Sequence, residues 1–277
     1  MVARARIALG TLVEIALPAS DATEQRFDAG FDAIAHVHAK MSPHDPESDL
    51  ARIARDAHRR AVVVDPDTWA ALELALTLWR ESRGVFDVTV AQGMARGRLD
   101  ALQLQTDFHV RANVAISLDL GGIAKGYAVD RAVAALRAAG ATAGRVNAGG
   151  DLRTFGAGEW MPVRVRDPAA PQFAMHLFDV TDFAVATSAD YFASTPALSD
   201  PRSRHSHMFG GSITVAAPTC AVADALTKIV ALDPGHAPAI LARHAAHAFR
   251  IGGVDARCQT TCGGSTAHLR LRQPIAA

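Results

Sequence analysis

Cysteine is scarce in this chain of 277 residues, and neither sign of charge is in surplus. The three cysteines, Cys220, Cys258 and Cys262, are too few for a disulfide framework. The spacing of the last two and the later His268 give only weak support for a zinc site. Lys plus Arg and Asp plus Glu each number 28, so the formal net charge is zero and gives no indication of a nucleic-acid partner.

Long apolar runs are also missing. The first sixteen residues carry Glu14 inside their apolar stretch, so they fit neither a signal peptide nor a membrane span. We therefore expect a cytoplasmic protein without membrane insertion. Hydrophobic residues make up 49% of the chain and charged residues 20%, which is a globular composition. Because neither a repeat nor a linker is visible, we expect one interwoven domain over residues 1–277.

The most informative stretch is Ser-Leu-Asp-Leu-Gly-Gly-Ile-Ala-Lys-Gly-Tyr at residues 117–127. An apolar run over residues 114–120 precedes Gly121 and Gly122, and an apolar-periodic segment over residues 127–139 follows. This pattern predicts a strand, a tight turn and a helix that ends at Gly140. The stretch is neither a G-x-G-x-x-G dinucleotide fingerprint nor a Walker A loop.

The predicted turn has the properties of a phosphate cradle. Its glycines let a ligand approach the backbone, and the free N–H groups of a helix start attract anions. Asp119 and Lys125 flank it with opposite charges. The same residues also suit an ordinary connecting turn with a solvated Lys125, so the local pattern leaves both interpretations open.

The rest of the chain alternates predicted strands and helices. Asp21 with Glu24 resembles a capping box for a helix that reaches Lys40, and Ser48 can cap a short helix. A helix opened by Pro66 reaches residue 83. We expect a further helix over residues 220–232, and strands over residues 6–16, 61–64, 145–147, 160–165, 173–177, 184–187 and 212–217.

Three acidic residues stand out from this background. Asp151 follows a second glycine pair, which makes a coincidental turn less plausible than one pair alone. Asp87 lies inside an apolar run, so it must be paired or close to solvent. Asp224 and Lys228 are four residues apart on a predicted helix, a spacing typical of a surface ion pair.

Taken together, these motifs resemble the ApbE family, the FAD:protein FMN transferases. The resemblance extends from Gly10 to about Leu232. Its segments are residues 10–15, 41–42, 45–48, 84–87, 117–130, 147–151, 186–191, 200–202 and 214–226. It implies an α+β fold of the ApbE type, related to the T-fold, with mixed sheets and packed helices.

The resemblance also implies a reaction, in which the FMN half of FAD moves to a Ser or Thr hydroxyl of an acceptor flavoprotein and AMP is released. It implies that magnesium lies near the diphosphate, held at Gly122, Asp224 and Thr227 and at the position of Lys228. The implied flavin contacts are Met41, Val85, Phe86, Asp87, Asp119, Gly121, Gly122, Lys125 and Leu198.

Three positions depart from the family pattern. Lys228 stands where the family usually has Thr, and an ammonium cannot ligate magnesium. Ala197 replaces the family's His, so His205 or His207 is a candidate to supply the base, although both also suit a surface loop. Leu9 replaces a Met without evident consequence. The candidate catalytic residues are therefore Asp224, Lys228, His205 and His207.

These departures leave two alternatives to FMN transfer. The chain could bind FAD without transferring any part of it, or it could use water and act as an FAD diphosphatase that yields FMN and AMP.

Overall fold

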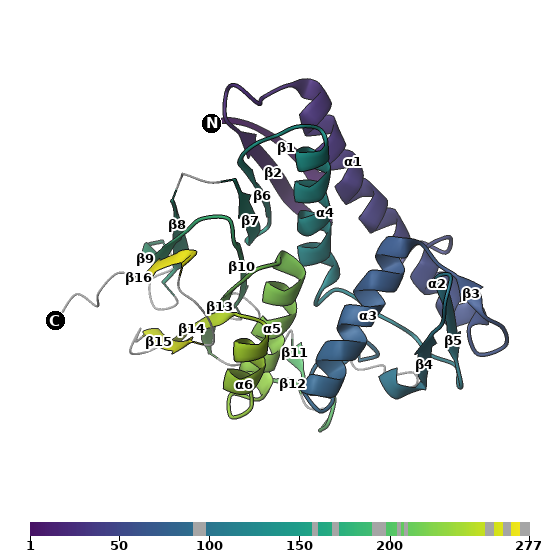
Figure 1. Cartoon of the computed structure of the whole chain (residues 1–277). Helices are drawn as coiled ribbons and strands as arrows, with labels where there is room; N and C mark the ends of the chain where they lie inside the picture. The colour runs from purple at the N-terminus through teal and green to yellow at the C-terminus, as the bar shows by residue number, and fades with distance from the viewer. Residues whose placement is uncertain are drawn as a thin grey trace.

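The computed structural model describes residues 1–90, 98–156, 160–167, 172–189, 198–203, 206–207, 210–252, 258–262 and 267–271. Its centre is an eight-stranded sheet in which all neighbouring strands are antiparallel (Figure 1). In sheet order the strands are β1 (Val2–Ala8), β2 (Thr11–Leu17), β6 (Gly144–Ala148), β7 (Asp151–Phe155), β10 (Ala184–Ala189), β13 (Gly211–Ala217), β14 (His247–Gly252) and β15 (Cys258–Cys262).

Three long helices pack on this sheet and on one another: α1 (Glu24–Met41), α4 (Ala124–Ala138) and α5 (Cys220–Leu232). Helix α4 lies on β6 and β7, α5 lies on β10 and β13, and α4 contacts both other helices (Figure 1). The line along which α4 meets α5 therefore runs over the middle of the sheet. Within the described residues, no helix combines the length and apolar character that a membrane span requires.

Smaller elements surround this centre. Helices α2 (Asp49–Asp56) and α3 (Pro66–Glu81) accompany a sheet of β3 (Val62–Val63), β5 (His109–Ala112) and β4 (Leu102–Leu104), beside a short 3₁₀ helix (Leu99–Ala101). A second sheet contains β16 (Leu269–Leu271), β9 (Ala174–Val180) and β8 (Met161–Arg166). The remaining elements are β11 (Leu198–Ser199), β12 (Ser206–His207) and α6 (Ala237–Arg243). Mixed sheets with packed helices confirm the predicted α+β class.

The main hydrophobic core fills the space between the large sheet and α1, α4 and α5, and it continues to α3. A second, smaller core lies beneath β8 and β9, where the rings of Phe178 and Phe249 stack with their centroids 4.5 Å apart. Full burial of such a ring contributes about 1.5–3 kcal/mol to folding. Both cores make the sheet a rigid support for side chains at the ends of its strands.

The first strand prediction was wrong. Residues 6–16 form parts of two strands, because β1 and β2 make a hairpin that turns at Leu9 and Gly10. Both residues have positive φ, 53° and 71°, as a tight two-residue hairpin turn requires. The apolar character of Leu9 masked that turn in the sequence.

The predicted cap of α1 was also wrong. Thr23, not Asp21, accepts a hydrogen bond from the backbone N–H of Arg26. Asp21 instead accepts from the backbone and the hydroxyl of Thr142, at 2.6 and 2.8 Å. It therefore ties the loop before α1 to the loop before β6.

The prediction of a strand over residues 114–120 was wrong: Val114 lies in a bend, and residues 115–120 belong to no strand or helix. One hydrogen bond, from Asp119 N to the carbonyl oxygen of Val88, ties this segment to the loop after α3. The helix that follows begins at Ala124, three residues earlier than expected, and its end at Gly140 is confirmed by a φ of 86°. The predicted helix over residues 220–232 is α5, and the short helix capped by Ser48 is α2.

Candidate functional site

Four charged side chains meet where α4, α5 and the start of β7 converge. The Nζ of Lys125 binds Asp151 Oδ2 and lies 4.0 Å from Asp224 Oδ2, and the Nζ of Lys228 binds Asp224 Oδ1. The two carboxylate side chains are each 2% exposed, whereas Lys125 is 30% and Lys228 21% exposed. The cluster thus buries its carboxylates, and its solvent-accessible surface belongs to the two lysine side chains.

The glycine turn before α4 positions Lys125. Asp119 Oδ1 accepts a hydrogen bond of 2.7 Å from the N–H of Gly121, which holds the turn that leads into the helix. No side chain of this turn caps α4. Instead, Asp224 Oδ2 accepts from the N–H of Gly126 at 3.4 Å, so a carboxylate of α5 occupies the anion-binding start of α4.

Helix α4 in turn supplies a carboxylate to the start of α5. Both oxygens of Asp130 accept hydrogen bonds from α5, one from the N–H of Cys220 and one from that of Ala221, each at 2.9 Å. Arg153 of β7 binds the same carboxylate at 2.6 Å. Each helix therefore supplies a carboxylate to the other's N-terminus, which fixes their relative position along the contact line.

All oxygens of Asp224 are engaged. Lys228 Nζ binds the main-chain carbonyl at 3.0 Å as well as the carboxylate, and the hydroxyl of Thr227 donates to the same carbonyl at 2.7 Å. The Thr227 hydroxyl also bonds Ser188 Oγ at 2.7 Å. Magnesium needs near-octahedral oxygen ligands, so this set does not fit the ion in the arrangement described.

Burial and mutual charge determine the protonation of this cluster. Burial, followed by the nearby Asp224 charge, raises the pKa of Asp151 to about 7. Burial also opposes ionisation of Asp224, but Lys228 and Lys125 hold its pKa below the usual range. Burial disfavours the charged Lys125, yet Asp224 and Asp151 keep its pKa above normal. Asp224 is thus the fixed negative charge, and Asp151 is the group that changes charge near neutral pH.

Two of the expected flavin contacts lie beside this cluster. A Cβ built on Gly122 would be 3.5 Å from Cε2 of Phe86 and 3.6 Å from Cε of Lys228. The glycine turn, the Phe86 ring and the lysine stem are therefore neighbours. Val85, which precedes the phenylalanine, is buried.

The other expected contacts are more scattered. Asp87 accepts hydrogen bonds from Thr89 N at 2.8 Å and Oγ1 at 2.7 Å, which confirms that it is paired. Met41 ends α1 as a buried core residue, and Leu198 pairs with His207 across β11 and β12. His205 lies outside the described residues. The described contacts of the charged cluster include none of these side chains.

The candidate site residues named from the sequence omit three members of the site: Asp130, Asp151 and Ser188. The second glycine pair drew attention to Asp151 without giving it a role, and Gly149 and Gly150 both have positive φ and follow the strand before it. No comparable local signal marks the other two, because their partners lie on elements distant in sequence.

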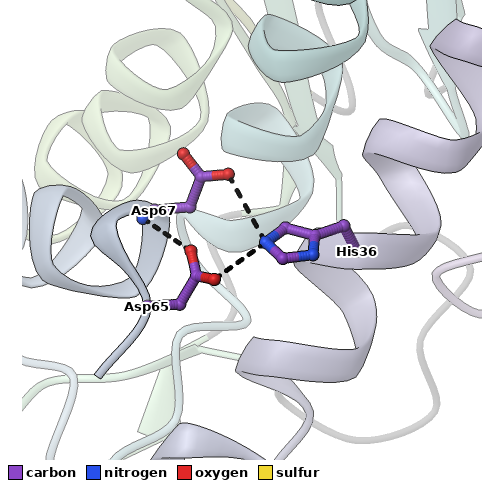
Figure 2. Close-up of side chains that lie close together, drawn as sticks. All are labelled: His36, Asp65 and Asp67. Carbon is purple, nitrogen blue, oxygen red and sulfur yellow. Dashed lines mark hydrogen bonds and ion pairs between the residues drawn. The ribbon is translucent and has the colours of Figure 1, made fainter. Parts of the chain in front are cut away.

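A second polar group joins α1 to the start of α3 (Figure 2). His36 Nε2 lies 3.0 Å from Asp65 Oδ2 and 3.9 Å from Asp67 Oδ2, and within the described residues these three side chains form the one group with metal-ligand spacing. Arg131 and the Tyr127 hydroxyl already bind Asp67 Oδ1, at 2.9 and 3.1 Å. The group therefore links α1, the start of α3 and α4 through polar contacts.

A cleft of 790 Å³ lies on the sheet face opposite α5. Thr187 and Ala189 of β10 line it, whereas Ser188 between them reaches Thr227 of α5, and successive strand residues point to opposite faces. The sheet thus separates this cleft from the charged cluster.

Fold and geometry together define an α+β protein in which two lysines, paired with two buried aspartates, lie close to a glycine turn. The chain belongs to the ApbE family, whose model matches residues 9–249.

Known proteins similar to this chain carry flavin-transferase names. It is 28% identical over 234 residues to the FAD:protein FMN transferase of Treponema pallidum (strain Nichols), a match that covers 68% of this chain and 64% of that protein. The chain thus spans less than two thirds of this relative.

Three solved structures share the fold. Flavin Transferase ApbE from Vibrio cholerae has a TM-score of 0.80 at 19% identity, with 95% of this chain and 96% of that chain covered. The ApbE protein of Thermotoga maritima gives 0.79 at 22%, with 94% and 96% covered. The flavinyl transferase ApbE of Pseudomonas stutzeri gives 0.80 at 22%, with 94% and 93% covered.

Proposed function

We propose that this protein transfers the FMN moiety of FAD to a Ser or Thr hydroxyl of an acceptor flavoprotein and releases AMP. Membership of the ApbE family and the name of the Treponema relative support this activity. No nucleic acid or membrane lipid is part of the proposal.

One observation carries the proposal: Lys125 and Lys228 are the partly exposed members of the cluster, the stem of Lys228 lies beside Gly122, and Asp151 and Asp224 stay buried. A diphosphate needs cationic groups and backbone that it can approach closely, and this arrangement offers both. The diphosphate of FAD would lie against these two lysines. The remaining proposed flavin contacts are Met41, Val85, Phe86, Asp87, Asp119, Gly121, Gly122 and Leu198.

The reaction follows from this placement. The acceptor oxygen attacks the phosphorus on the FMN side, the bond from this phosphorus to the bridging oxygen breaks, and AMP leaves with that oxygen. Because negative charge spreads over the phosphoryl oxygens, fixed cations supply most of the rate enhancement. Lys125 and Lys228 fill this role, and Asp224 holds both in place.

The attacking hydroxyl must also lose its proton. We propose His205 or His207 as the acceptor of this proton, since Ala197 stands at the family's histidine position. The resemblance also suggests magnesium at Gly122, Asp224 and Thr227. Since the oxygens of Asp224 are already engaged, no step of the proposed reaction is routed through the ion.

The test is incubation of the purified protein with FAD and a candidate acceptor that exposes Ser or Thr, followed by electrophoresis under denaturing conditions and nucleotide chromatography. Flavin that stays on the acceptor, with AMP in equal amount, supports transfer. Free FMN with AMP would instead indicate a diphosphatase, and intact FAD bound to the protein would indicate a flavin-binding protein. Replacement of both His205 and His207 by Ala should abolish transfer, and unchanged transfer would remove them from the reaction.

A further inference from the structure

Lysine is rare in this chain. Of the 28 Lys and Arg residues, three are lysines: Lys40, Lys125 and Lys228. Two of these three meet at Asp224. An ammonium is a compact point charge, whereas a guanidinium is a broad planar fork, so the site uses the cationic side chain closest in size to a small ion.

We propose that the ammonium of Lys228 takes the place of a divalent cation at Asp224 and contacts the diphosphate of FAD, so that the protein binds FAD without a divalent metal. This inference rests on the proposed use of FAD. It concerns how this chain compensates for its departure from the family pattern at residue 228.

The contacts of Lys228 Nζ are those of a bound cation. The ammonium binds two oxygens of the same residue, the carboxylate Oδ1 and the main-chain carbonyl of Asp224. Thr227, another residue expected at the metal, turns its hydroxyl to that carbonyl and to Ser188. The oxygens of Asp224 and the hydroxyl of Thr227 thus already have hydrogen-bond partners within the protein.

Charge leads to the same conclusion. Asp224 has two ammonium neighbours, Lys228 Nζ bound to its Oδ1 and Lys125 Nζ at 4.0 Å from its Oδ2. Thr at residue 228 would remove the ammonium that pairs with Oδ1, and a metal ion could replace that positive charge. With Lys228 present, a divalent ion beside Asp224 would meet two ammonium groups and their repulsion.

Access favours the ammonium over the carboxylate as the group that meets a ligand. Lys228 is 21% exposed and Asp224 is 2% exposed. The stem of Lys228 runs beside Gly122, since a Cβ there would be 3.6 Å from its Cε. A diphosphate that approaches the glycine turn would therefore meet the Lys228 side chain before it reaches the buried carboxylate of Asp224.

The test compares the wild-type chain with Lys228→Thr, Lys228→Met and the control Lys40→Thr, which removes the lysine outside the cluster. FAD is titrated with EDTA present and followed by flavin fluorescence. Mn²⁺, which shares the octahedral oxygen preference of magnesium, is titrated into FAD-free and FAD-loaded protein and followed by the electron paramagnetic resonance of the free ion.

We expect wild type and Lys40→Thr to bind FAD with the same Kd with and without EDTA, and to bind no Mn²⁺ at Asp224. Lys228→Met should bind FAD at least tenfold more weakly in EDTA. Lys228→Thr should show the same loss, gain one Mn²⁺ site and recover FAD affinity when the ion is added. A new Mn²⁺ site in Lys228→Thr cannot arise from misfolding. This result therefore tests the proposal even if Lys228→Met proves unstable.

Either of two results overturns the proposal: a Mn²⁺ ion bound by wild type as tightly as by Lys228→Thr, or no Mn²⁺ bound by Lys228→Thr. Loss of wild-type FAD binding in EDTA would overturn it as well. These readouts need no acceptor and no turnover. A wild-type protein that binds no FAD would refute the proposed function, and the Mn²⁺ titration of FAD-free protein would still decide the role of Lys228.

Discussion

Gly126 of α4 lies against Cys220 of α5 so closely that a Cβ on the glycine would be 2.3 Å from the cysteine's carbonyl oxygen. It would also lie 2.6 Å from the carbonyl carbon of Cys220 and 2.8 Å from the nitrogen of Ala221. All three are backbone atoms, which cannot rotate away. The absence of a side chain at this one position is what lets the two helices meet and brings Lys125 to Asp224.

Replacement of Gly126 by Ala should therefore separate α4 from α5. We expect a loss of about 2 kcal/mol or more in the free energy of unfolding, because the new methyl group overpacks a rigid backbone contact. FAD binding should weaken with it. Urea unfolding and FAD titration measure the two effects.

Gly235→Ala is the matched control. The nearest atom to its new Cβ would be the Asp233 carboxylate at 3.7 Å, an ordinary contact distance. Its unfolding free energy should stay within about 0.5 kcal/mol of wild type. Equal stability of Gly126→Ala and Gly235→Ala would mean that the helices tolerate a wider separation.

The helices on either side of this contact could be predicted from sequence. The apolar period and Gly140 predicted α4 closely, and α5 was predicted with its observed bounds. The i,i+4 spacing of Asp224 and Lys228 correctly predicted an ion pair. It could not predict that the carboxylate is buried, because that burial comes from the packing of α4, which a local spacing does not encode.

The parts of the site that sequence could not predict all depend on long-range contacts. Lys125 contacts Asp151 of β7, and Asp130 contacts the start of α5. Both contacts form only after α4 and α5 have packed on the sheet. A hydrogen-bond partner distant in the chain leaves no periodic signal. The resemblance to a family supplied the expectation that the glycine turn and the late helix are neighbours, which Gly122 and Lys228 confirm.

The buried Asp224–Lys228 pair should show strong energetic coupling. Asp224→Asn leaves two ammonium groups with one carboxylate and should cost about 3 kcal/mol, as loss of one partner from a buried pair does. In a double-mutant cycle with Lys228→Met, we expect a coupling energy of about 1–3 kcal/mol from urea unfolding.

The exposed pair Arg4–Glu24, with side chains 48% and 68% exposed, provides the comparison. Its coupling energy should stay below about 1 kcal/mol, because solvent screens the two charges. Additivity of Asp224→Asn and Lys228→Met within about 0.5 kcal/mol would show that the two groups act independently.

Removal of the Asp130 carboxylate should loosen the start of α5. Asp130→Ala deprives the N–H groups of Cys220 and Ala221 of their acceptor and leaves Arg153 unpaired, at a cost of about 2 kcal/mol. Asp130→Asn keeps one acceptor oxygen and should recover part of this loss.

A local readout separates this effect from a general loss of stability. The thiol of Cys220 is fully buried, and burial raises its pKa well above normal. In Asp130→Ala it should react faster with a thiol reagent under native conditions, with the labelled residue identified by peptide mass spectrometry. A labelling rate equal to that of wild type would show that Asp130 does not hold this helix start.

The pKa of Asp151, raised to about 7, predicts a stability that depends on pH. The ordinary Asp value is about 3.9, so between about pH 4 and 7 the folded protein binds more protons than the unfolded chain. The free energy of unfolding contributed by this group therefore falls as pH rises through that window and levels off above it. Asp224, with its lowered pKa, acts in the opposite direction and only below about pH 4.

Urea unfolding of wild type and Asp151→Asn at half-unit steps from pH 5 to 8 measures this dependence. All other titratable groups are common to both proteins, so the difference between the two curves isolates Asp151. We expect wild type to lose stability relative to the variant by roughly 1 kcal/mol per pH unit up to about pH 7. Asp107→Asn, in an exposed turn with a φ of 55°, should follow the wild-type curve. Parallel curves for wild type and Asp151→Asn would show that this carboxyl is ionised throughout the pH range. Asp151 would then be a permanently charged partner of Lys125, as Asp224 is, and not a group that titrates near neutral pH.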